Sequence, residues 1–122
     1  LTISNQIHVN NGGFLAFIVK GNITVDNSVG TNVVAQTTPA QVEGVYISDG
    51  TLTIAAGNPP GDLKFIGQGT FVGWGGVLLP RQYKVSNNNN SYPTDLFEFR
   101  PDLLYNIPVR MKRPLLLWQE TN

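Results

Sequence analysis

A nine-residue pattern centred on a glycine occurs three times in this chain of 122 residues. Each copy has an aromatic residue and then an isoleucine shortly before the glycine, a small polar residue directly after it, and a large apolar residue next. The copies are FIVKGNITV (17–25), YISDGTLTI (46–54) and FIGQGTFVG (65–73). Such a repeat is typical of stacked, equivalent strands. It therefore predicts the shape of the protein more directly than its chemistry.

In a stack of parallel strands, each residue lies beside the equivalent residue of the next strand, so similar side chains form ladders. The repeat predicts three such ladders: Phe17/Tyr46/Phe65, Ile18/Ile47/Ile66 and Ile23/Leu52/Phe71. Glycine at the marked position suits a corner, because it tolerates positive φ. Residues two and four positions after the glycine are expected to point inward.

The spacing of the copies favours a solenoid. With Asn5 in place of a first glycine, the marked positions are 5, 21, 50 and 69, which are 16, 29 and 19 residues apart. Two of these separations are close to one coil of a β-solenoid. We predict an all-β fold, a short right-handed parallel β-solenoid (β-helix). A β-sandwich or jelly roll shows the same alternation and is the alternative, but it gives no reason for the glycine-centred string to recur.

The chain is expected to form a single domain, 1–122. The coils occupy residues 1–93, with a polar loop inserted at about 26–41 and a second loop at 55–62. The four asparagines at 87–90 predict an exposed tip with left-handed backbone. Residues 94–122 are predicted to form a C-terminal cap with one or two short helical turns, at 94–99 and 102–105. This cap would cover the apolar end of the last coil.

Charge and composition exclude several classes of function. Eight Lys and Arg balance eight Asp and Glu, which argues against a nucleic-acid partner. The chain has no cysteine, so it has neither a disulfide nor a thiolate metal site. No apolar run approaches the roughly 18 residues of a membrane span. We expect no cofactor and no membrane span.

No catalytic or metal-binding constellation is evident, and we predict that the protein is not an enzyme. His8 is the only histidine, and it has no partner at a suggestive spacing. The acids Asp26, Asp49 and Asp62 lie in or beside turns, where aspartate is common for backbone reasons. The glycine-rich stretch 67–76 lacks the lysine of a Walker loop.

Two groups of residues are candidate contacts for a ligand or partner. Trp74 lies between two glycines, which would leave its indole face open, and Tyr83 and Tyr92 are further candidate stacking residues for a glycan. Arg110, Lys112 and Arg113 form a basic cluster close to Arg100. This cluster is either a contact for an anionic polymer or a solvated edge of the cap.

The chain resembles right-handed parallel β-helix modules of the bactofilin or polymer-forming kind. It is more similar still to the C-terminal β-helical regions of large predicted surface proteins from uncultured small-genome bacteria. The resemblance is carried by LAFIVKGNITVD, VEGVYISDGTLTI, QGTFVGWGGVLLPRQY, LFEFRPDLLYNIP, MKRP and WQE, and it covers nearly the whole chain. It implies secretion and a scaffold role. The long insertion and elaborate tail differ from cytoplasmic bactofilins.

We therefore expect a non-enzymatic structural domain of an extracellular or cell-surface protein. The first coil has no matching cap, so its apolar residues Leu1, Ile3, Ile7 and Val9 are the predicted assembly edge. This edge would contact a second copy, head to tail in a filament, or an adjacent coil of a longer chain. The alternative function is a carbohydrate-binding or adhesin module.

Overall fold

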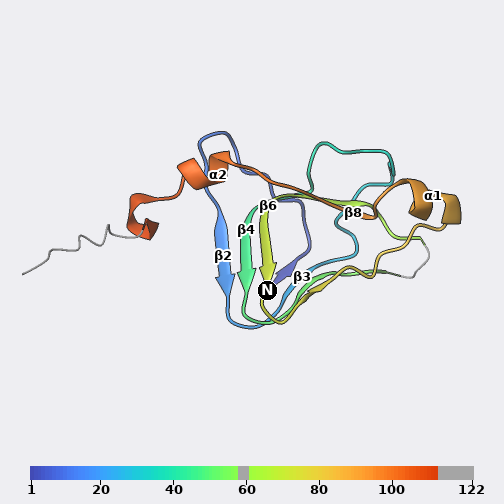
Figure 1. The fold of residues 1–122 in the computed structure, drawn as a ribbon, viewed down its shortest axis with the longest axis horizontal. Coiled ribbons are helices and arrows are strands. Elements are labelled where there is room, and N and C mark those ends of the chain that lie inside the picture. Colours follow the sequence, from blue (N-terminus) through green and yellow to red (C-terminus); the bar gives the residue numbers. More distant parts are fainter. Residues whose placement is uncertain (58–60, 113–122) are drawn as a thin grey trace, which may run out of the picture.

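The protein is built from two sheets that share a corner. The computed structural model describes residues 1–57 and 61–112. One sheet contains β1 (Thr2–Ile3), β3 (Ile23–Val25), β5 (Leu52–Ile54) and β7 (Val77–Leu78), in that order. The other contains β2 (Ala16–Val19), β4 (Val42–Ser48), β6 (Phe65–Gly73) and β8 (Asp95–Glu98). All neighbouring strands are parallel (Figure 1).

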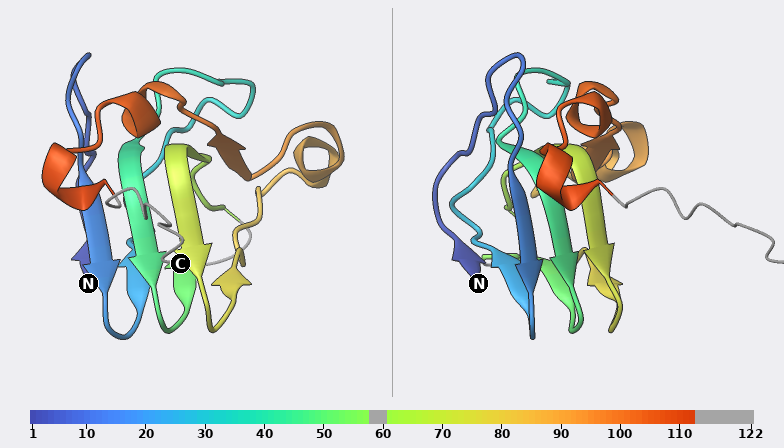
Figure 2. Two further views of the ribbon diagram at one scale, coloured as in Figure 1. Left: turned by 60° about the vertical axis from the view of Figure 1, so that its left-hand side comes forward. Right: turned by 90° about the vertical axis from the view of Figure 1, so that its left-hand side faces the viewer.

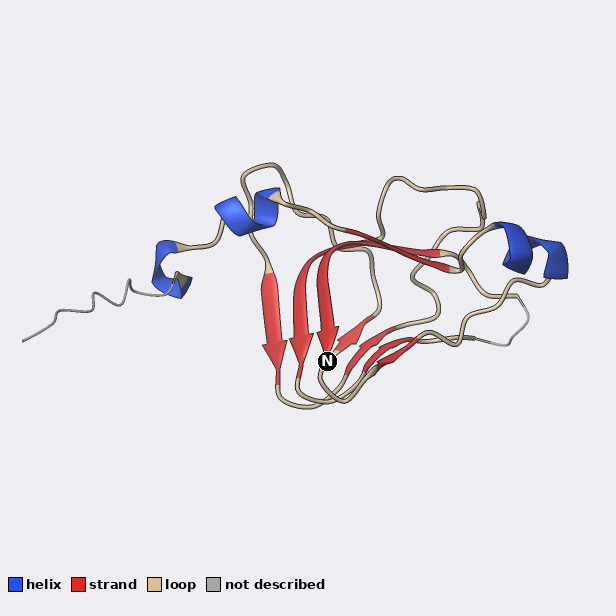
Figure 3. Cartoon of the chain, in the orientation of Figure 1, coloured by secondary structure: helices blue, strands red, loops and turns tan. Residues whose placement is uncertain are grey.

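The chain passes alternately from one sheet to the other. Short turns after β2, β4 and β6 lead into β3, β5 and β7, so the two sheets meet at these turns and diverge away from them (Figure 3). Hydrogen bonds between levels hold the turns together: the Thr51 amide donates to Asn22 Oδ1 at 2.9 Å, and the Gly21 amide donates to Asp49 Oδ1. The aspartate and asparagine of these turns therefore have structural roles.

The prediction of a closed, all-β solenoid is wrong. The structure has two separate four-stranded parallel sheets together with short helices, an arrangement closer to the α/β type than to an all-β helix. The physical reason lies in the segments that lead from β3, β5 and β7 back to the sheet of β4, β6 and β8, at 26–41, 55–64 and 79–94. They differ from one another in sequence, and their described parts contribute no strand to a third sheet.

The register of the repeat is confirmed for its first two copies and is wrong for the third. Phe17 pairs with Tyr46, Ile18 with Ile47, and Ile23 with Leu52, as predicted. On the next level, however, the partners are Phe71, Val72 and Val77 rather than Phe65, Ile66 and Phe71. Gly69 pairs with Gly44 inside the sheet, so it is not a corner residue.

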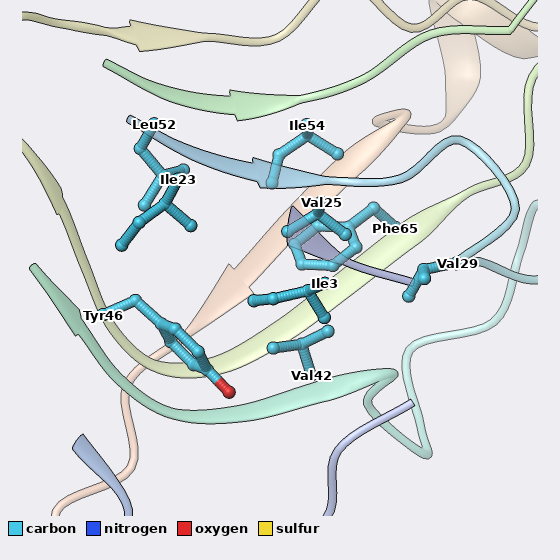
Figure 4. Close-up of a cluster of buried hydrophobic side chains, with 9 residues drawn as sticks. All are labelled: Ile3, Ile23, Val25, Val29, Val42, Tyr46, Leu52, Ile54 and Phe65. Atoms are coloured by element: carbon cyan, nitrogen blue, oxygen red, sulfur yellow. The ribbon is translucent and has the colours of Figure 1, made fainter. Parts of the chain in front are cut away.

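The hydrophobic core fills the space between the two sheets, and Val29 of the 26–41 loop adds to it from outside the strands (Figure 4). Its central element is a stack of aromatic rings: the centroid of Tyr46 lies 5.7 Å from that of Phe17 and 5.2 Å from that of Phe71. Inward-pointing aliphatic side chains of the other sheet face this stack, as the alternation predicts. The core cluster consists of Ile3, Ile23, Val25, Val29, Val42, Tyr46, Leu52, Ile54 and Phe65.

The C-terminal region differs from the expected cap. Residues 95–98 form β8 on the edge of β6, where a helical turn was predicted, because Leu96 continues the ladder beyond Ile66. The predicted turn at 102–105 is confirmed as α2 (Asp102–Tyr105), and η1 (Val109–Met111) follows. The asparagine tip is the helix α1 (Ser86–Ser91), and no described residue other than glycine has positive φ. Figure 2 shows α2 and η1 on the side of the sheets away from α1.

We predict that Gly69→Ala destabilises the protein by more than about 2 kcal/mol. Gly69 has φ of +135°, and an added Cβ would overlap the carbonyl oxygen of Gly44 on the neighbouring strand. Chemical denaturation measures the change. Gly76→Ala is the control: Gly76 has φ of +118° but nothing near the position of a Cβ, so only the backbone strain of about 1–2 kcal/mol applies. Equal losses in the two variants would contradict the close approach of the two glycines.

Candidate functional sites

The aromatic residues proposed as one stacking surface lie in different places. Trp74 follows β6 and is 78% exposed, and it lines a hollow of about 370 Å³ with Ile18, Lys20 and Asp49. Tyr92 lines a different cavity, next to α1. Tyr83 is buried, and its hydroxyl donates to the carbonyl of Pro93 at 2.8 Å. These three side chains therefore do not form a common platform for a glycan.

Burial also sets the chemistry of Tyr83. It raises the pKa of the Tyr83 hydroxyl to about 12, and the neighbouring Asp95 carboxylate adds to this shift. The residue is a neutral hydrogen-bond donor at physiological pH. Because the side chain is buried, a ligand has little access to its ring.

Arg100 is engaged in contacts of its own, apart from the exposed Arg110 and Lys112. Arg110 and Lys112 are exposed on and after η1, and Arg113 lies outside the described residues. Arg100 is engaged elsewhere: it contacts Glu43 Oε2 at 2.7 Å and Asp102 Oδ2 at 3.0 Å. It also donates to the carbonyl of Val9 at 2.8 Å. Arg100 thus joins the C-terminal segment to the first residues of the chain.

The residues of the predicted assembly edge lie at one end of the two sheets, which we call the head end. Leu1 is exposed, whereas Ile3 belongs to the core. Ile7 continues the edge of the β2 sheet by pairing with Val42, and the Val9 amide donates to Glu43 Oε2 at 2.6 Å. A hollow of about 270 Å³ at this end is lined by Leu1, Ile3, Ile7 and Phe17, among others. Val9 lies apart from it, and its carbonyl accepts a hydrogen bond from Arg100.

The opposite end, which we call the tail end, also has an apolar hollow. It measures about 300 Å³ and is lined by Phe71, Val77, Leu79, Phe97 and Phe99, with Gly69 and Glu98. The sequence predicted that residues 94–122 close this end. Within the described part of that segment, β8 covers only the first half of β6, and Val77, Phe97 and Phe99 stay exposed.

Two buried cations, which sequence reasoning did not single out, fix the loops around the core. Arg81 is only 3% exposed, and it donates to the carbonyls of Ala55, Val29, Leu63 and Asp26 at 2.9–3.1 Å. Its guanidinium carbon lies 5.8 Å from the centroid of the Phe65 ring. Lys64 is also buried, and its Nζ donates to the carbonyl of Val34 at 2.9 Å. Both side chains donate hydrogen bonds to carbonyls of the inserted 26–41 loop.

Arg81 also forms part of a polar cavity of about 510 Å³ between the 79–94 loop and the start of β8. Asp95 lines the same cavity. Burial raises the pKa of its carboxyl and outweighs the opposing effects of the Thr94 hydroxyl and Arg81, while Asp62 raises the pKa further. Asp95 Oδ1 is buried and has no hydrogen-bond partner within the described structure. A buried oxygen without a partner is rare in proteins and marks a candidate site.

The described residues contain no group of three or more His, Cys, Asp or Glu side chains that could hold a metal ion. His8 Nδ1 lies 3.6 Å from Glu43 Oε1 at an exposed position beside the Arg100 contacts. Across 1–57 and 61–112, no helix has both the length and the apolar character that a membrane crossing requires.

The chain matches no family model, no curated protein and no solved structure. The resemblance to bactofilin-type modules therefore stays a prediction, and the function has to be argued from the structure.

We predict that Arg81→Met lowers the free energy of unfolding by about 2–4 kcal/mol, because four carbonyl groups lose a charged donor at once. Arg81→Lys is the matched control. It keeps the charge but has only three donors on one nitrogen, so its loss should be smaller. Chemical denaturation compares the variants, and a Met variant within about 0.5 kcal/mol of the native protein would contradict the clamp.

A second prediction concerns Asp95. Because its pKa in the folded protein is raised above 3.8, folding favours its protonated form, and this contribution is lost as pH rises through the raised pKa. Asp95→Asn should therefore be more stable than the native protein at pH 7, with the difference shrinking as pH falls toward 3.8. Thermal unfolding across this range measures it. An Asp95 carboxyl carbon that titrates at or below 3.8 in an NMR experiment would contradict the prediction.

Proposed function

We propose that this protein is a non-enzymatic scaffold domain whose copies add to one another head to tail through the edges of both sheets. The observation that carries the proposal is that each sheet ends, on both sides, in a parallel strand with no further partner within the described residues. Unpaired strand edges are templates for pairing with another chain.

At the head end the free edges are β1 and β2. The carbonyl of Leu15 accepts from Val45 of β4, and that of Val19 accepts from Asp49 just after β4. Alternation along the strand therefore directs the peptide groups of Ala16 and Ile18 away from β4. Ile18 is 71% exposed, and neither proline nor lysine occurs within β2. Proline and lysine are among the residues with which proteins commonly protect a strand edge, so β2 lacks this protection.

At the tail end the free edges are β7 and the edge formed by β8 and the second half of β6. The Leu52 amide donates to the carbonyl of Gly76, so the peptide group of Val77 points away from β5. The tail hollow lies between these edges and is lined mainly by apolar and aromatic side chains. The head hollow has Leu1, Ile3, Ile7 and Phe17 in its lining, beside the polar residues Thr2, Ser4 and Asn5. The two ends therefore match in strand direction and in apolar character.

The occupant we propose is a second copy of the chain. All strands are parallel, so a copy added at the tail end keeps the direction of the sheets and leaves its own tail end free. A contact of this heterologous kind does not close on itself and produces a filament. The resemblance to polymer-forming surface modules supports this role and an extracellular or cell-surface location.

We predict that the purified chain forms concentration-dependent assemblies and that Ile18→Pro weakens them about tenfold, since one outward N–H donor is lost. This donor is not used within the sheet, and proline is tolerated at such edge positions. Ile18→Thr is the matched control, because it keeps the N–H. Analytical ultracentrifugation and electron microscopy measure assembly, and circular dichroism confirms folding.

Mixing two variants tests the head-to-tail geometry. Val77→Pro blocks the tail end in the same way, with Val77→Thr as its control. The head-blocked and tail-blocked chains should each assemble poorly alone, yet form a one-to-one heterodimer when mixed. Monodisperse monomers of the native chain at all concentrations, or assembly that the proline variants do not affect, would contradict the proposal.

A further inference from the structure

The polar cavity between the 79–94 loop and β8 has the features of a ligand site, and of the residues that line it only Leu79 also lines the tail hollow. Its volume of about 510 Å³ lies within the range of small-molecule sites. The polar residues around it are Arg81, Gln82, Asn89, Thr94 and Asp95, and Tyr92 contributes an aromatic ring.

The cavity has a rigid polar wall. The guanidinium of Arg81 is fixed by its four hydrogen bonds to main-chain carbonyls, and the side chain is almost completely buried. Asn89 is fixed as well: its Oδ1 accepts from the Tyr83 amide at 2.8 Å and its Nδ2 donates to the Tyr83 carbonyl at 3.0 Å. These groups are held in place before any ligand arrives, which reduces the entropic cost of binding.

One hydrogen-bond acceptor of this cavity is not satisfied by the described protein. Asp95 Oδ2 accepts from the Thr94 hydroxyl at 3.0 Å, whereas Oδ1 is buried and has no partner. A buried carboxylate oxygen without a partner is costly, and a hydroxyl group of a ligand would remove that cost by donating to it once the carboxyl group turns toward the cavity. The raised pKa of Asp95 is consistent with this unsatisfied environment.

Charge indicates which ligands fit. The buried cation Arg81 opposes a metal ion or an ammonium group beside Asp95. Conversely, the carboxylates of Asp95, Asp62 and Asp26 surround Arg81 and oppose an anion. A neutral ligand that donates hydrogen bonds through hydroxyl groups suits both sets of charges.

The remaining lining fits a sugar ring. Tyr92 is 39% exposed, and Leu79 and Pro93 add apolar surface beside it. An aromatic face and a few fixed polar groups together match the mixed surface of a saccharide, which has apolar C–H faces and a rim of hydroxyls. We propose that this cavity binds a neutral mono- or disaccharide, with a sugar hydroxyl donating to the Asp95 carboxylate and the ring lying against Tyr92.

Titration of the labelled native chain tests this proposal. The probes are glucose, galactose, mannose, N-acetylglucosamine and the β-1,4-linked disaccharides of glucose and N-acetylglucosamine, each up to about 50 mM because weak millimolar affinity is expected for a shallow site. Amide chemical shifts should change for residues 79–95 with at least one of these sugars. No change with any of them, or changes confined to the Trp74 hollow, would overturn the proposal.

Variants separate binding from folding. Tyr92→Ala should weaken binding of the identified sugar by about tenfold or more, whereas Tyr105→Ala, an exposed tyrosine on α2, should leave it unchanged. Asp95→Asn should also weaken binding about tenfold, since a charged acceptor is replaced by a neutral one. This loss would accompany the higher stability expected for the same variant. Unchanged affinity in both cavity variants, or binding of phosphate or calcium in preference to every sugar, would contradict the proposal.

Discussion

The stack of Phe17, Tyr46 and Phe71 is the interaction on which the rest of the structure depends. Tyr46 lies between the other two rings at 5.7 and 5.2 Å and is fully buried, and its hydroxyl is satisfied by the carbonyl of Glu43 at 3.0 Å. Because all three rings lie on adjacent strands, this contact fixes the register of β2, β4 and β6. The turns after β2, β4 and β6, the sheet of β1, β3, β5 and β7, and the free edges at the head and tail ends follow from that register.

Arg81 fixes the loops around the core through hydrogen bonds to their main-chain carbonyls. Two unrelated loops, 26–41 and 55–64, approach the margin of the core, and the guanidinium of Arg81, which lies in a third loop, binds carbonyls from both. A buried arginine costs desolvation energy, which is offset here by its hydrogen bonds and by its contact with the Phe65 ring. The same clamp brings Arg81 close to Asp95 and so creates the polar cavity. Loop structure and candidate binding site therefore have one cause.

Much of the strand pairing was predictable from residue patterns, and the wrong register of the third copy follows from one pattern that the prediction missed. GVYISDG (44–50) and GTFVGWG (69–75) align without a gap and give the observed register, in which Gly69 pairs with Gly44. Choosing Gly69 as a corner shifted the third copy by six residues. The cavity could not be found in this way, since Arg81, Asn89 and Asp95 belong to no repeat and the loop between β7 and β8 brings them together.

The sequence by itself determined the alternation of inward and outward side chains, the parallel pairing of the first two copies and the positions of the loops. These are local properties, set by residue type and by a spacing of two along each strand. Only the tertiary structure decided that residues 1–57 and 61–112 form two sheets without a third, that Tyr83 is buried while Tyr92 is exposed, and that Arg100 reaches Val9 from 91 residues away. Such contacts depend on how loops of unrelated sequence satisfy buried polar groups, and no short pattern encodes that outcome.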